Sequence, residues 1–600
     1  MGNLPSSEHD HPHDHSHGHP HDHPHDHAHG QHHEHDHQGH GHGDHQHEPL
    51  ELGPATDLTV PDGELPPADL GRRNFLRAAG LLGAGAATAS LVGVGGAATA
   101  AAEEQTHQGT ERYPRDGFRW LAGDHHIHTQ FSPDGLYRVE DQVRHASAFG
   151  LGWMVITDHG TVQHAKIGVE KVNPDIAAAR RRHPDMLVFQ GLEWNIPAAE
   201  HGTVFVHPGK NEVAVLKAFE NGFDGGVRGA TDNTPANEAL AVQGLQFLRG
   251  AVNRERVKDA LMLANHPARQ GIDSPHEVRA WRDGAKGIAV GWEGAPGHQA
   301  AGIPAAAGGP GSSRGYYGNA PRADRSFPGY PLESYRSWGG FDFYTATVGG
   351  LWDSLLAEGK PWWISANSDS HTNFLDTVER GPGSDFTTNG YYEDPVYSGK
   401  PNTSAGDFHP GFYSRTHVGV RKAGYAAVMS ALRAGNVWVD HGQLVESVDV
   451  QVRAGGAVVG LGGILTAKRG SRIELRVRIV AATRANWAGF VPALRKVDLI
   501  VGAVTGPAAD RDTMYAPETR VRRSWDVSGK PVVEIAQSLG VVDDRGLYLR
   551  LRGSDGNRTA PGYRGAAVDP AGPAMDVQGD ADPWKDLWFY TNPVFVLPRR

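Results

Sequence analysis

The chain of 600 residues contains no cysteine. That absence excludes disulfide bonds, thiolate zinc sites, iron–sulfur clusters and a cysteine nucleophile. Long apolar runs are scarce as well. The best candidate, residues 78–96, consists mainly of Ala, Gly, Leu and Val. A stretch so rich in glycine is too weakly apolar for a stable membrane anchor.

An excess of positive charge is also lacking. The formal net charge is −12, and residues 1–102 carry most of it, with 14 acidic side chains against three arginines. The remaining 55 acidic and 54 basic side chains nearly balance. The rest of the chain therefore lacks the basic footprint of a general nucleic-acid binder.

Length and composition predict four regions. A chain of 600 residues is too long for one compact core. We expect a disordered His-rich tail at 1–48 and a linker with an export signal at 49–102. A catalytic domain at 112–440 and a second folded domain at 441–600 complete the prediction.

The His-rich tract at 9–47 alternates histidine with Asp, Pro, Gly and Gln, and Ala28 is its sole apolar residue. Such a tract has no apolar side chains around which to fold. Its histidines could bind zinc, nickel, cobalt or copper loosely. An expanded tail without any specific role is the alternative interpretation.

After the His-rich tract come a charged segment, an apolar segment and a run of small residues, in that order. Paired arginines in Arg72-Arg73-Asn74-Phe75-Leu76-Arg77 precede the apolar stretch, and Ala-x-Ala sites follow at 98–102. This order resembles a twin-arginine signal, which directs folded proteins to export. It predicts the twin-arginine export machinery as a partner and a secreted or extracytoplasmic location.

Histidines and carboxylates recur at the ends of apolar runs farther along the chain. The motifs are Asp124-His125-His126-Ile127-His128, Ser132-Pro133-Asp134-Gly135, Thr157-Asp158-His159, Gly191-Leu192-Glu193, Asn265-His266-Pro267 and Asp369-Ser370-His371, with His201 in addition. Imidazoles and carboxylates are the ligands that borderline and hard divalent metals bind. So many of them predict a hydrolytic site with more than one metal.

The apolar runs before these motifs predict strands that alternate with helices. Strands are expected at 153–156, 187–189, 260–264, 287–290 and 362–366, and helices at 139–149, 234–258 and 425–434. This alternation favours a parallel sheet, closed as a barrel or open. The polar motifs follow the carboxyl ends of the strands, where barrel enzymes place their chemistry.

The order of the six motifs resembles the polymerase and histidinol phosphatase superfamily, called PHP, over residues 120–435. The resemblance implies an α/β fold, a distorted (β/α)7 TIM-like barrel, and metal-dependent phosphoesterase activity. It implies that the metal ligands are His126, His128, Asp134, His159, Glu193, His201, His266, Asp369 and His371. They would hold two or three divalent metal ions, Zn, Mn or Fe, with Glu193 bridging two of them.

Several neighbouring residues are open to more than one interpretation. His207 competes with His201 for one ligand position, and the resemblance favours His201. Asp124 and Asp158 are expected to hold ligand imidazoles by their N–H groups. His125 is expected to point away from its neighbours, into solvent or behind the ligands.

Catalytic roles are predicted for Glu193, His159, His371 and Asp369. Arg269 could bind a phosphate bidentately, although a plain surface arginine is the alternative. Glu293 and His298 could line the pocket. The Gly- and Pro-rich stretches 295–340 and 372–415 are expected to be loops without secondary structure, which either cover the site or have no function.

After residue 440 the pattern changes to period-two strands at 447–452, 472–480, 496–501, 532–535, 546–551 and 592–596. This pattern predicts a C-terminal β-sandwich domain with no ligand cluster of its own.

The combined prediction is a secreted phosphoesterase that hydrolyses a small phosphomonoester or phosphodiester with a metal-bound hydroxide. Two alternatives remain. The same barrel could hydrolyse an amide or ester, or the chain could be a non-catalytic exported metal-binding protein, as the His-rich tract suggests.

Overall fold

The computed structural model describes residues 118–599. The predicted His-rich tail and export signal lie outside these residues. Within the described part of the chain, no helix combines the length and apolar character needed to cross a membrane.

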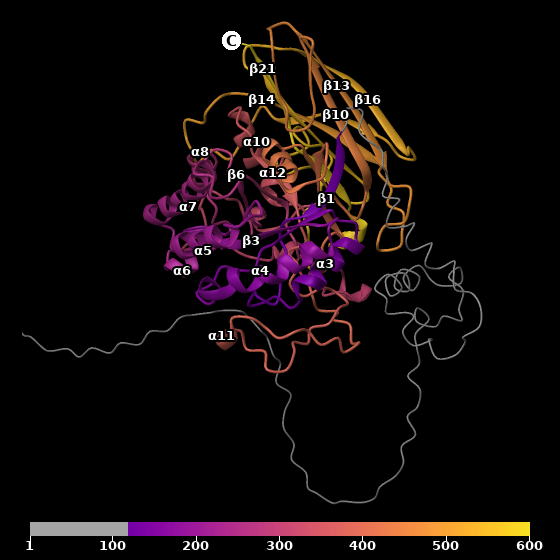
Figure 1. The fold of residues 1–600 in the computed structure, drawn as a ribbon. Coiled ribbons are helices and arrows are strands. Elements are labelled where there is room, and N and C mark those ends of the chain that lie inside the picture. The colour runs from indigo at the N-terminus through magenta and orange to yellow at the C-terminus, as the bar shows by residue number, and fades with distance from the viewer. Residues whose placement is uncertain (1–117, 600) are drawn as a thin grey trace, which may run out of the picture. The chain divides into compact units, whose positions relative to one another are not determined.

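The first half of the described chain alternates strands with helices (Figure 1). The elements are β1 (Arg119–Asp124), α3 (Val139–Ala148), β2 (Trp153–Ile156), α4 (His164–Arg182), β3 (Leu187–Asn195), β4 (His201–Val206), α5 (Glu212–Phe223), α6 (Gly225–Arg228), α7 (Pro235–Asn253), β5 (Ala260–Ala264), α8 (Pro275–Gly284), β6 (Ala289–Ala295), α9 (Phe343–Ala346), α10 (Leu351–Ala357), β7 (Trp363–Ala366), β8 (Ser414–Val420), α12 (Tyr425–Ala434) and β9 (Val437–His441).

The predicted α/β alternation is confirmed, but the sheet is mixed rather than parallel. β1, β2 and β3 run parallel, as do β5, β6 and β7, whereas β4 is antiparallel to both β3 and β5. The cause is the connection between β3 and β4, residues 196–200. A link this short permits a hairpin-like reversal and is too short for the crossover that parallel strands require.

No backbone ladder closes the curved sheet within the described residues, since β7 pairs only with β6. Two smaller contacts span the gap. Beyond the strand ends, Ile127 forms an isolated parallel bridge with Ser370. The Thr416 hydroxyl of β8 accepts the backbone N–H of Ala366 in β7 at 2.8 Å. The ends of β1 and β7 are thus held together at the edge that carries the ligand motifs.

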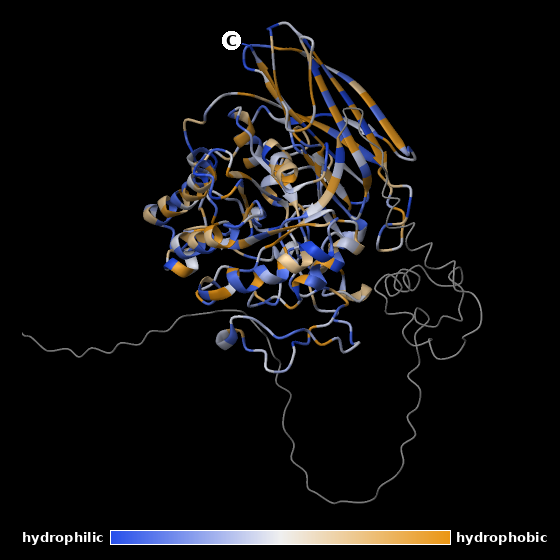
Figure 2. Cartoon of the chain, in the orientation of Figure 1, coloured by the Kyte–Doolittle hydropathy of each residue, from blue (hydrophilic) through white to orange (hydrophobic). Residues whose placement is uncertain are grey.

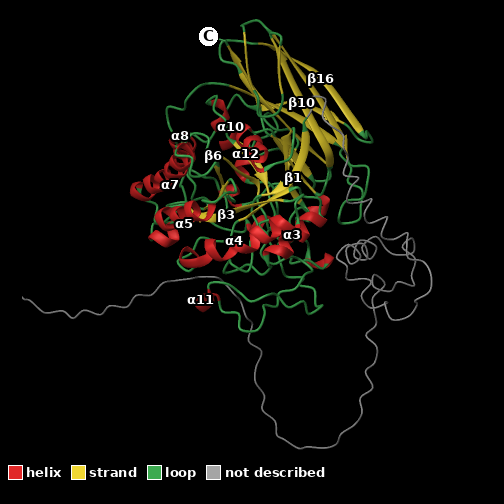
Figure 3. Cartoon of the chain, in the orientation of Figure 1, coloured by secondary structure: helices red, strands yellow, loops and turns green. Residues whose placement is uncertain are grey.

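Apolar periodicity explains how the helices pack against this sheet. In α3, Val139, Val143 and Ala146 recur at helical spacing and are buried. All four residues of β2 are buried, as a strand covered on both faces requires. α12 spans the predicted residues and ends at Gly435, whose φ of 68° suits a glycine C-cap. Figure 3 shows the helices gathered around these strands.

The second half is rich in strands. They are β10 (Val445–Ala454), β11 (Ala457–Val459), β12 (Ile464–Ala467), β13 (Arg472–Ala481), β14 (Lys496–Ala503), β15 (Arg520–Asp526), β16 (Val532–Val541), β17 (Leu547–Ser554), β18 (Thr559–Ala560), β19 (Gly572–Pro573), β20 (Trp588–Thr591) and β21 (Val594–Pro598). Each predicted strand region beyond residue 440 contains one of them. Along these strands, hydrophilic and hydrophobic residues alternate (Figure 2).

The two halves share one sheet. β9, which spans the predicted domain boundary at 440, pairs with β20, and β17, β21, β12, β14 and β15 continue from there. A separate sheet in the order β11-β10-β13-β16 packs its apolar side chains, such as Val450 and Val477, into one core with Leu499 and Leu551. The C-terminal strands therefore form two layers, one of which continues the mixed sheet that contains β1 to β9.

The long loops contain short helical turns that the sequence did not predict. These are η2 (Gln299–Gly302), η3 (Ala305–Ala307), η4 (Arg314–Tyr316), η5 (Leu332–Tyr335) and α11 (Phe386–Asn389), and η6 (Pro583–Lys585) occurs near the C-terminus. Arg314 fixes the first loop, because its buried guanidinium bonds to Asp586 and donates to the Tyr413 hydroxyl at 2.6 Å. The expectation of structureless loops is therefore wrong for these segments.

His417 of β8 should make stability depend on pH. Burial lowers its pKa to about 4, against the opposing effect of Asp440, whose Oδ1 lies 2.8 Å from its Nε2. Its pKa in an unfolded chain is about 6.5. Between these values the unfolded chain binds a proton that the folded chain does not, so stability is lost as the pH falls. From pH 8 to pH 5 this linkage amounts to about 2 kcal/mol.

The test compares urea unfolding of the wild type and His417→Gln at pH 8 and pH 5. At pH 8 the difference in unfolding free energy between the two proteins reports only the packing and hydrogen bonding that the variant has lost. We expect the variant to lose about 2 kcal/mol less than the wild type on acidification. An equal loss in both proteins would contradict the argument.

Candidate metal centre

The nine predicted ligands lie together at one edge of the mixed sheet, in four overlapping groups of close donor atoms. His126 and His128 follow β1, His159 follows β2, His266 follows β5, and Asp369 and His371 follow β7. Two residues depart from the expected position beyond a strand end. Glu193 lies inside β3, and His201 opens β4. Because β4 runs antiparallel to β3 and β5, its first residue, His201, lies at the edge where those two strands end.

Glu193 lies at the centre of the group. Its carboxylate is buried and faces imidazoles from both sides of the site. Oε1 lies 2.9 Å from His201 Nδ1, 3.2 Å from His126 Nε2 and 3.3 Å from His266 Nε2, and Oε2 lies 2.9 Å from His159 Nδ1 and 3.3 Å from His128 Nε2. One oxygen of this carboxylate faces one set of imidazoles and the other oxygen faces a second set, so Glu193 could hold a cation on either side.

Asp369 closes the site from the opposite strand. Its Oδ1 lies 3.0 Å from His126 Nε2 and 3.2 Å from His128 Nε2. Its Oδ2 lies 2.7 Å from Nε2 of His298. The two imidazoles after β1 therefore lie between two carboxylates, Glu193 and Asp369.

The donor chemistry of this group fits metal ions. Nδ1 of His126 lies 2.7 Å from Glu293, which leaves Nε2 as the ring nitrogen that faces Glu193 and Asp369. Nε2 of His128 lies 3.0 Å from that Nε2. Oε2 of Glu193 and Nδ1 of His266 are buried without a hydrogen-bond partner. Carboxylates and imidazoles that converge in a buried space call for positive charge there, which bound cations would supply.

The charges of the group also favour cations. Burial lowers the pKa of His126, but the nearby carboxylates, Asp369 first, outweigh it and hold that pKa well above its ordinary value. Conversely, burial raises the pKa of Glu193, but the histidines around it, His126 first, hold it well below its usual range. The carboxylates thus stay ionised and draw positive charge to the site.

Asp134 lies at the open side of the group. Its side chain is 51% exposed, with Oδ2 3.1 Å from His159 Nε2 and 3.5 Å from His371 Nε2. The His371 ring stacks on His128 with ring centroids 3.9 Å apart. Solvent therefore reaches the site past Asp134, His159 and His371.

Asp124 and Asp158 do not hold ligand imidazoles, so that prediction is wrong. Asp124 accepts the backbone N–H groups of His126 and Ser368 at 3.0 Å each. Asp158 accepts the N–H and hydroxyl of Thr129. Both carboxylates fix the backbone that presents the ligands. The imidazole of His126 is held instead by Glu293, which also accepts the His266 N–H at 2.7 Å.

His125 does point away from its neighbours, but it is fully buried rather than solvated. Its Nε2 lies 2.7 Å from Ser365 Oγ and its Nδ1 lies 3.2 Å from Thr203 Oγ1. It therefore fills the sheet interior with a satisfied polar contact. His207 belongs to none of the close ligand groups described above and bonds the carbonyl of Pro208 at 2.8 Å, so the geometry favours His201 over it.

Two carboxylates that the sequence analysis missed belong to the site. Glu200 forms a close group with His201 and His266. Its position directly before His201 was the one signal that could have shown it. Asp407 accepts the His371 N–H at 2.7 Å and also contacts His298 Nδ1. It lies in the long 372–415 loop, where no pattern indicated a role.

Strained backbone accompanies these contacts. Asp369, His266 and His298 have positive φ angles of 47°, 29° and 54°. Non-glycine residues adopt such angles rarely and at a cost of about 1–3 kcal/mol, chiefly at functional sites. Gly297 permits the arrangement, because a Cβ there would lie 2.2 Å from Cβ of Asp369.

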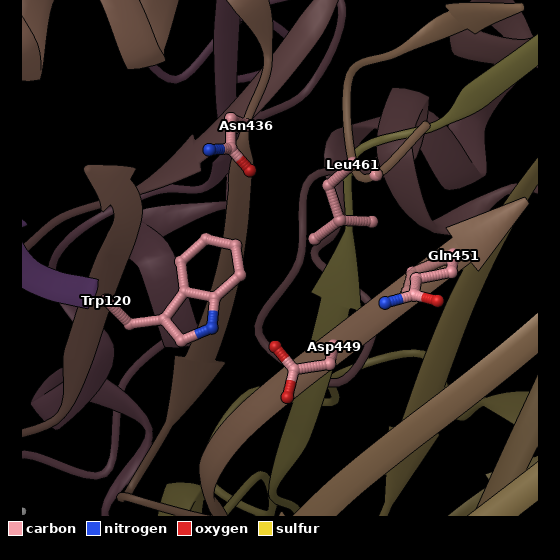
Figure 4. Close-up of a pocket in the computed structure, with 7 residues that line it drawn as sticks. Trp120, Asn436, Asp449, Gln451 and Leu461 are labelled. Atoms are coloured by element: carbon pink, nitrogen blue, oxygen red, sulfur yellow. The ribbon is translucent and has the colours of Figure 1, made fainter. Parts of the chain in front are cut away.

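Arg269 lies beside this group and is three-quarters buried. Its Nη2 lies 3.5 Å from Glu200 Oε2, and its side chain is 25% exposed. A partly exposed guanidinium near a buried carboxylate cluster can bind an incoming anion. The surface recess drawn in Figure 4 is a different feature. It is lined by Trp120, Asn436, Asp449, Gln451 and Leu461 and contains none of the nine ligands.

Part of the chain is similar to known proteins. The PHP domain family model matches residues 124–265. No curated protein sequence matches the chain. A solved structure from Bacteroides vulgatus, a two-domain protein containing a predicted PHP-like metal-dependent phosphoesterase, is 13% identical; the match covers 73% of this chain and 92% of that one, with a TM-score of 0.29. The matched residues include the first four motifs of the ligand set and His201, and they end at Asn265; residues 124–265 therefore match the PHP domain family.

Proposed function

We propose that this PHP-domain protein is an exported, metal-dependent phosphoesterase acting on a small phosphomonoester or phosphodiester. The observation that carries the proposal is the buried Glu193 carboxylate, which lies within 3.3 Å of imidazoles from four separate segments. The PHP domain supports metal-dependent hydrolysis by such a site. We further propose that residues 112–440 act as the distorted (β/α)7 barrel of that superfamily and residues 441–600 as a β-sandwich.

The ligand set fits two or three divalent ions of the Zn, Mn or Fe type, since imidazole and carboxylate suit all of them. Such ions supply a nucleophile from water near neutral pH and stabilise negative charge on phosphoryl oxygens. Glu193 and Asp369 would hold such ions together with His126 and His128.

The chain's own side chains supply the remaining functions. Arg269 would bind a non-bridging phosphate oxygen in a charge-assisted hydrogen bond. His159 and His371 both contact the exposed Asp134 carboxylate, so whichever of the two is not bound to a metal would hold the proton for the leaving oxygen.

A substrate panel tests the proposed reaction. Full-length protein loaded with zinc or manganese is assayed on p-nitrophenyl phosphate, bis-p-nitrophenyl phosphate and p-nitrophenyl acetate. We expect turnover of at least one phosphoester and none of the acetate. Glu193→Gln should lower kcat about 100- to 1000-fold, the loss typical of removing one group that stabilises the transition state electrostatically.

His207→Gln serves as the matched control and should retain full activity, since the His207 ring bonds the Pro208 carbonyl and lies against Tyr425, outside the ligand groups described above. Turnover of the acetate alone would favour the amide or ester hydrolase. Metal binding with no turnover of any probe would favour the non-catalytic metal-binding protein.

Substitution of Arg269 tests its role in phosphate binding. Loss of a charge-assisted hydrogen bond costs about 1.5–3 kcal/mol. Arg269→Ala should therefore raise KM for the best phosphoester about 10- to 100-fold, with a smaller change in kcat. Arg322→Ala, which removes a half-exposed arginine paired with Asp324, should leave KM unchanged. Equal KM values for the two variants would show that Arg269 does not bind the phosphate.

Export is tested at the N-terminus, which lies outside the described residues. We propose cleavage after Ala100 or Ala102, so the His-rich tract would leave with the signal. Mass spectrometry of the extracytoplasmic protein should show a mature chain that begins near residue 101 or 103. A double Arg72→Lys, Arg73→Lys variant should accumulate inside the cell. An exported chain that still carries the tract would contradict this proposal.

A further inference from the structure

A second group of metal-ligand side chains lies outside the candidate metal centre. His145 of α3 meets Asp376 and His409 of the 372–415 loop, and the candidate ligand atoms of all three lie within 4.8 Å of one another. None of these residues belongs to the nine ligands. The rings of His145 and His409 approach edge-on, with centroids 4.3 Å apart.

The polar contacts within this group are incomplete. Nε2 of His409 lies 3.8 Å from Asp376 Oδ2, which is too far for a hydrogen bond. Nδ1 of His145 is buried without any hydrogen-bond partner. Two imidazoles and a carboxylate thus face one another without a proton-mediated bond between them.

The charge states of the group match those of metal ligands. Burial lowers the pKa of His145 to about 3 and that of His409 to about 4. Both imidazoles are therefore neutral at pH 7, the form that coordinates metals. Burial raises the pKa of the Asp376 carboxyl above its ordinary value, and a bound cation would favour its ionised form.

Neighbouring side chains orient these ligands. Asn373 lies 3.0 Å from His409 Nδ1 through its side-chain amide. Asn373 donates its amide N–H to this Nδ1 and accepts from the Ser370 hydroxyl at 2.9 Å. A cation on Nε2 would turn the amide, so that its oxygen accepts the Nδ1 proton instead. The rings of Tyr137 and Phe149 lie against His145 and His409, with centroids 5.6 Å apart in each case, so the site is enclosed.

We propose that His145, Asp376 and His409 bind one borderline divalent cation such as Zn²⁺, which fastens the 372–415 loop to helix α3. Two histidines and one carboxylate with a remaining position for water form a familiar ligand set for such ions. Asp376 and His409 lie near the two ends of the loop, so one ion closes it against a rigid helix and reduces its conformational freedom.

The proposed ion would lie next to the candidate metal centre, but the two sites share no ligand. Asp407, two residues before His409, accepts the His371 N–H and contacts His298. Asn373, two residues after His371, bonds both His409 and the Ser370 hydroxyl. A loop held at Asp376 and His409 therefore keeps Asp407 and His371 in place.

Metal content and anomalous scattering test the site directly. Full-length wild type, His145→Gln, His409→Gln and the control His207→Gln are dialysed together against zinc and analysed for bound metal. The His-rich tract contributes equally to all four. We expect each site variant, but not the control, to hold about one zinc less than the wild type. Crystals grown with zinc should show an anomalous peak between the three side chains.

Limited trypsin digestion provides a second measurement that does not depend on activity. Arg380 and Lys400 are exposed in the loop, and cleavage there should be at least several-fold faster in both site variants than in the control. Unchanged zinc content in correctly folded variants, judged by circular dichroism, would overturn the proposal. A water-like density peak without anomalous signal would do the same. Neither result depends on whether the protein hydrolyses phosphoesters.

Discussion

The structure of the site depends on the burial of one carboxylate, Glu193, among imidazoles. A buried carboxylate without compensating charge is strongly destabilising. The surrounding histidines cannot all donate protons to it, because Glu293 already accepts from His126 and the remaining ring nitrogens converge on the same space. Bound cations would resolve this conflict. The strand ends and the strained backbone at Asp369 and His266 bring the ligands around the space that such cations would occupy.

The mixed sheet makes this convergence possible. β4 reverses direction after a short link and brings His201 to the edge where β1, β2, β5 and β7 end. On the opposite side, the sheet continues through β9 into the C-terminal strands. Buried contacts such as Arg314 with Asp586 fasten the 295–340 loop to those strands. The C-terminal half thus supports the loop that carries His298 to Asp369.

The long loops contribute more to the site than their composition indicated. His298 and Asp407 come from different loops and form a connected chain of contacts to Asp369 and His371. The proposed ion at His145, Asp376 and His409 would hold the second loop in the same arrangement. Loop order and ligand geometry are therefore coupled through short, buried polar contacts rather than through apolar packing.

The sequence by itself determined the alternation of strands and helices and the period-two strands after residue 440. These features depend on local periodicity, which a single sequence displays directly. The nine candidate ligands were predicted from short motifs through their resemblance to a known family. It also indicated His201 over His207, through the family resemblance. Its prediction that Asp124 and Asp158 would hold imidazoles was wrong, because backbone N–H groups lie nearer to both carboxylates.

Only the tertiary structure decided the direction of β4, the burial of His125 and the roles of Glu293, Glu200 and Asp407. It also revealed the group around His145. Each of these depends on partners far away in the chain, such as the 167 residues between His126 and Glu293. Spacing along a sequence cannot express such contacts, because the fold, and not the local pattern, determines which strand ends and loops meet.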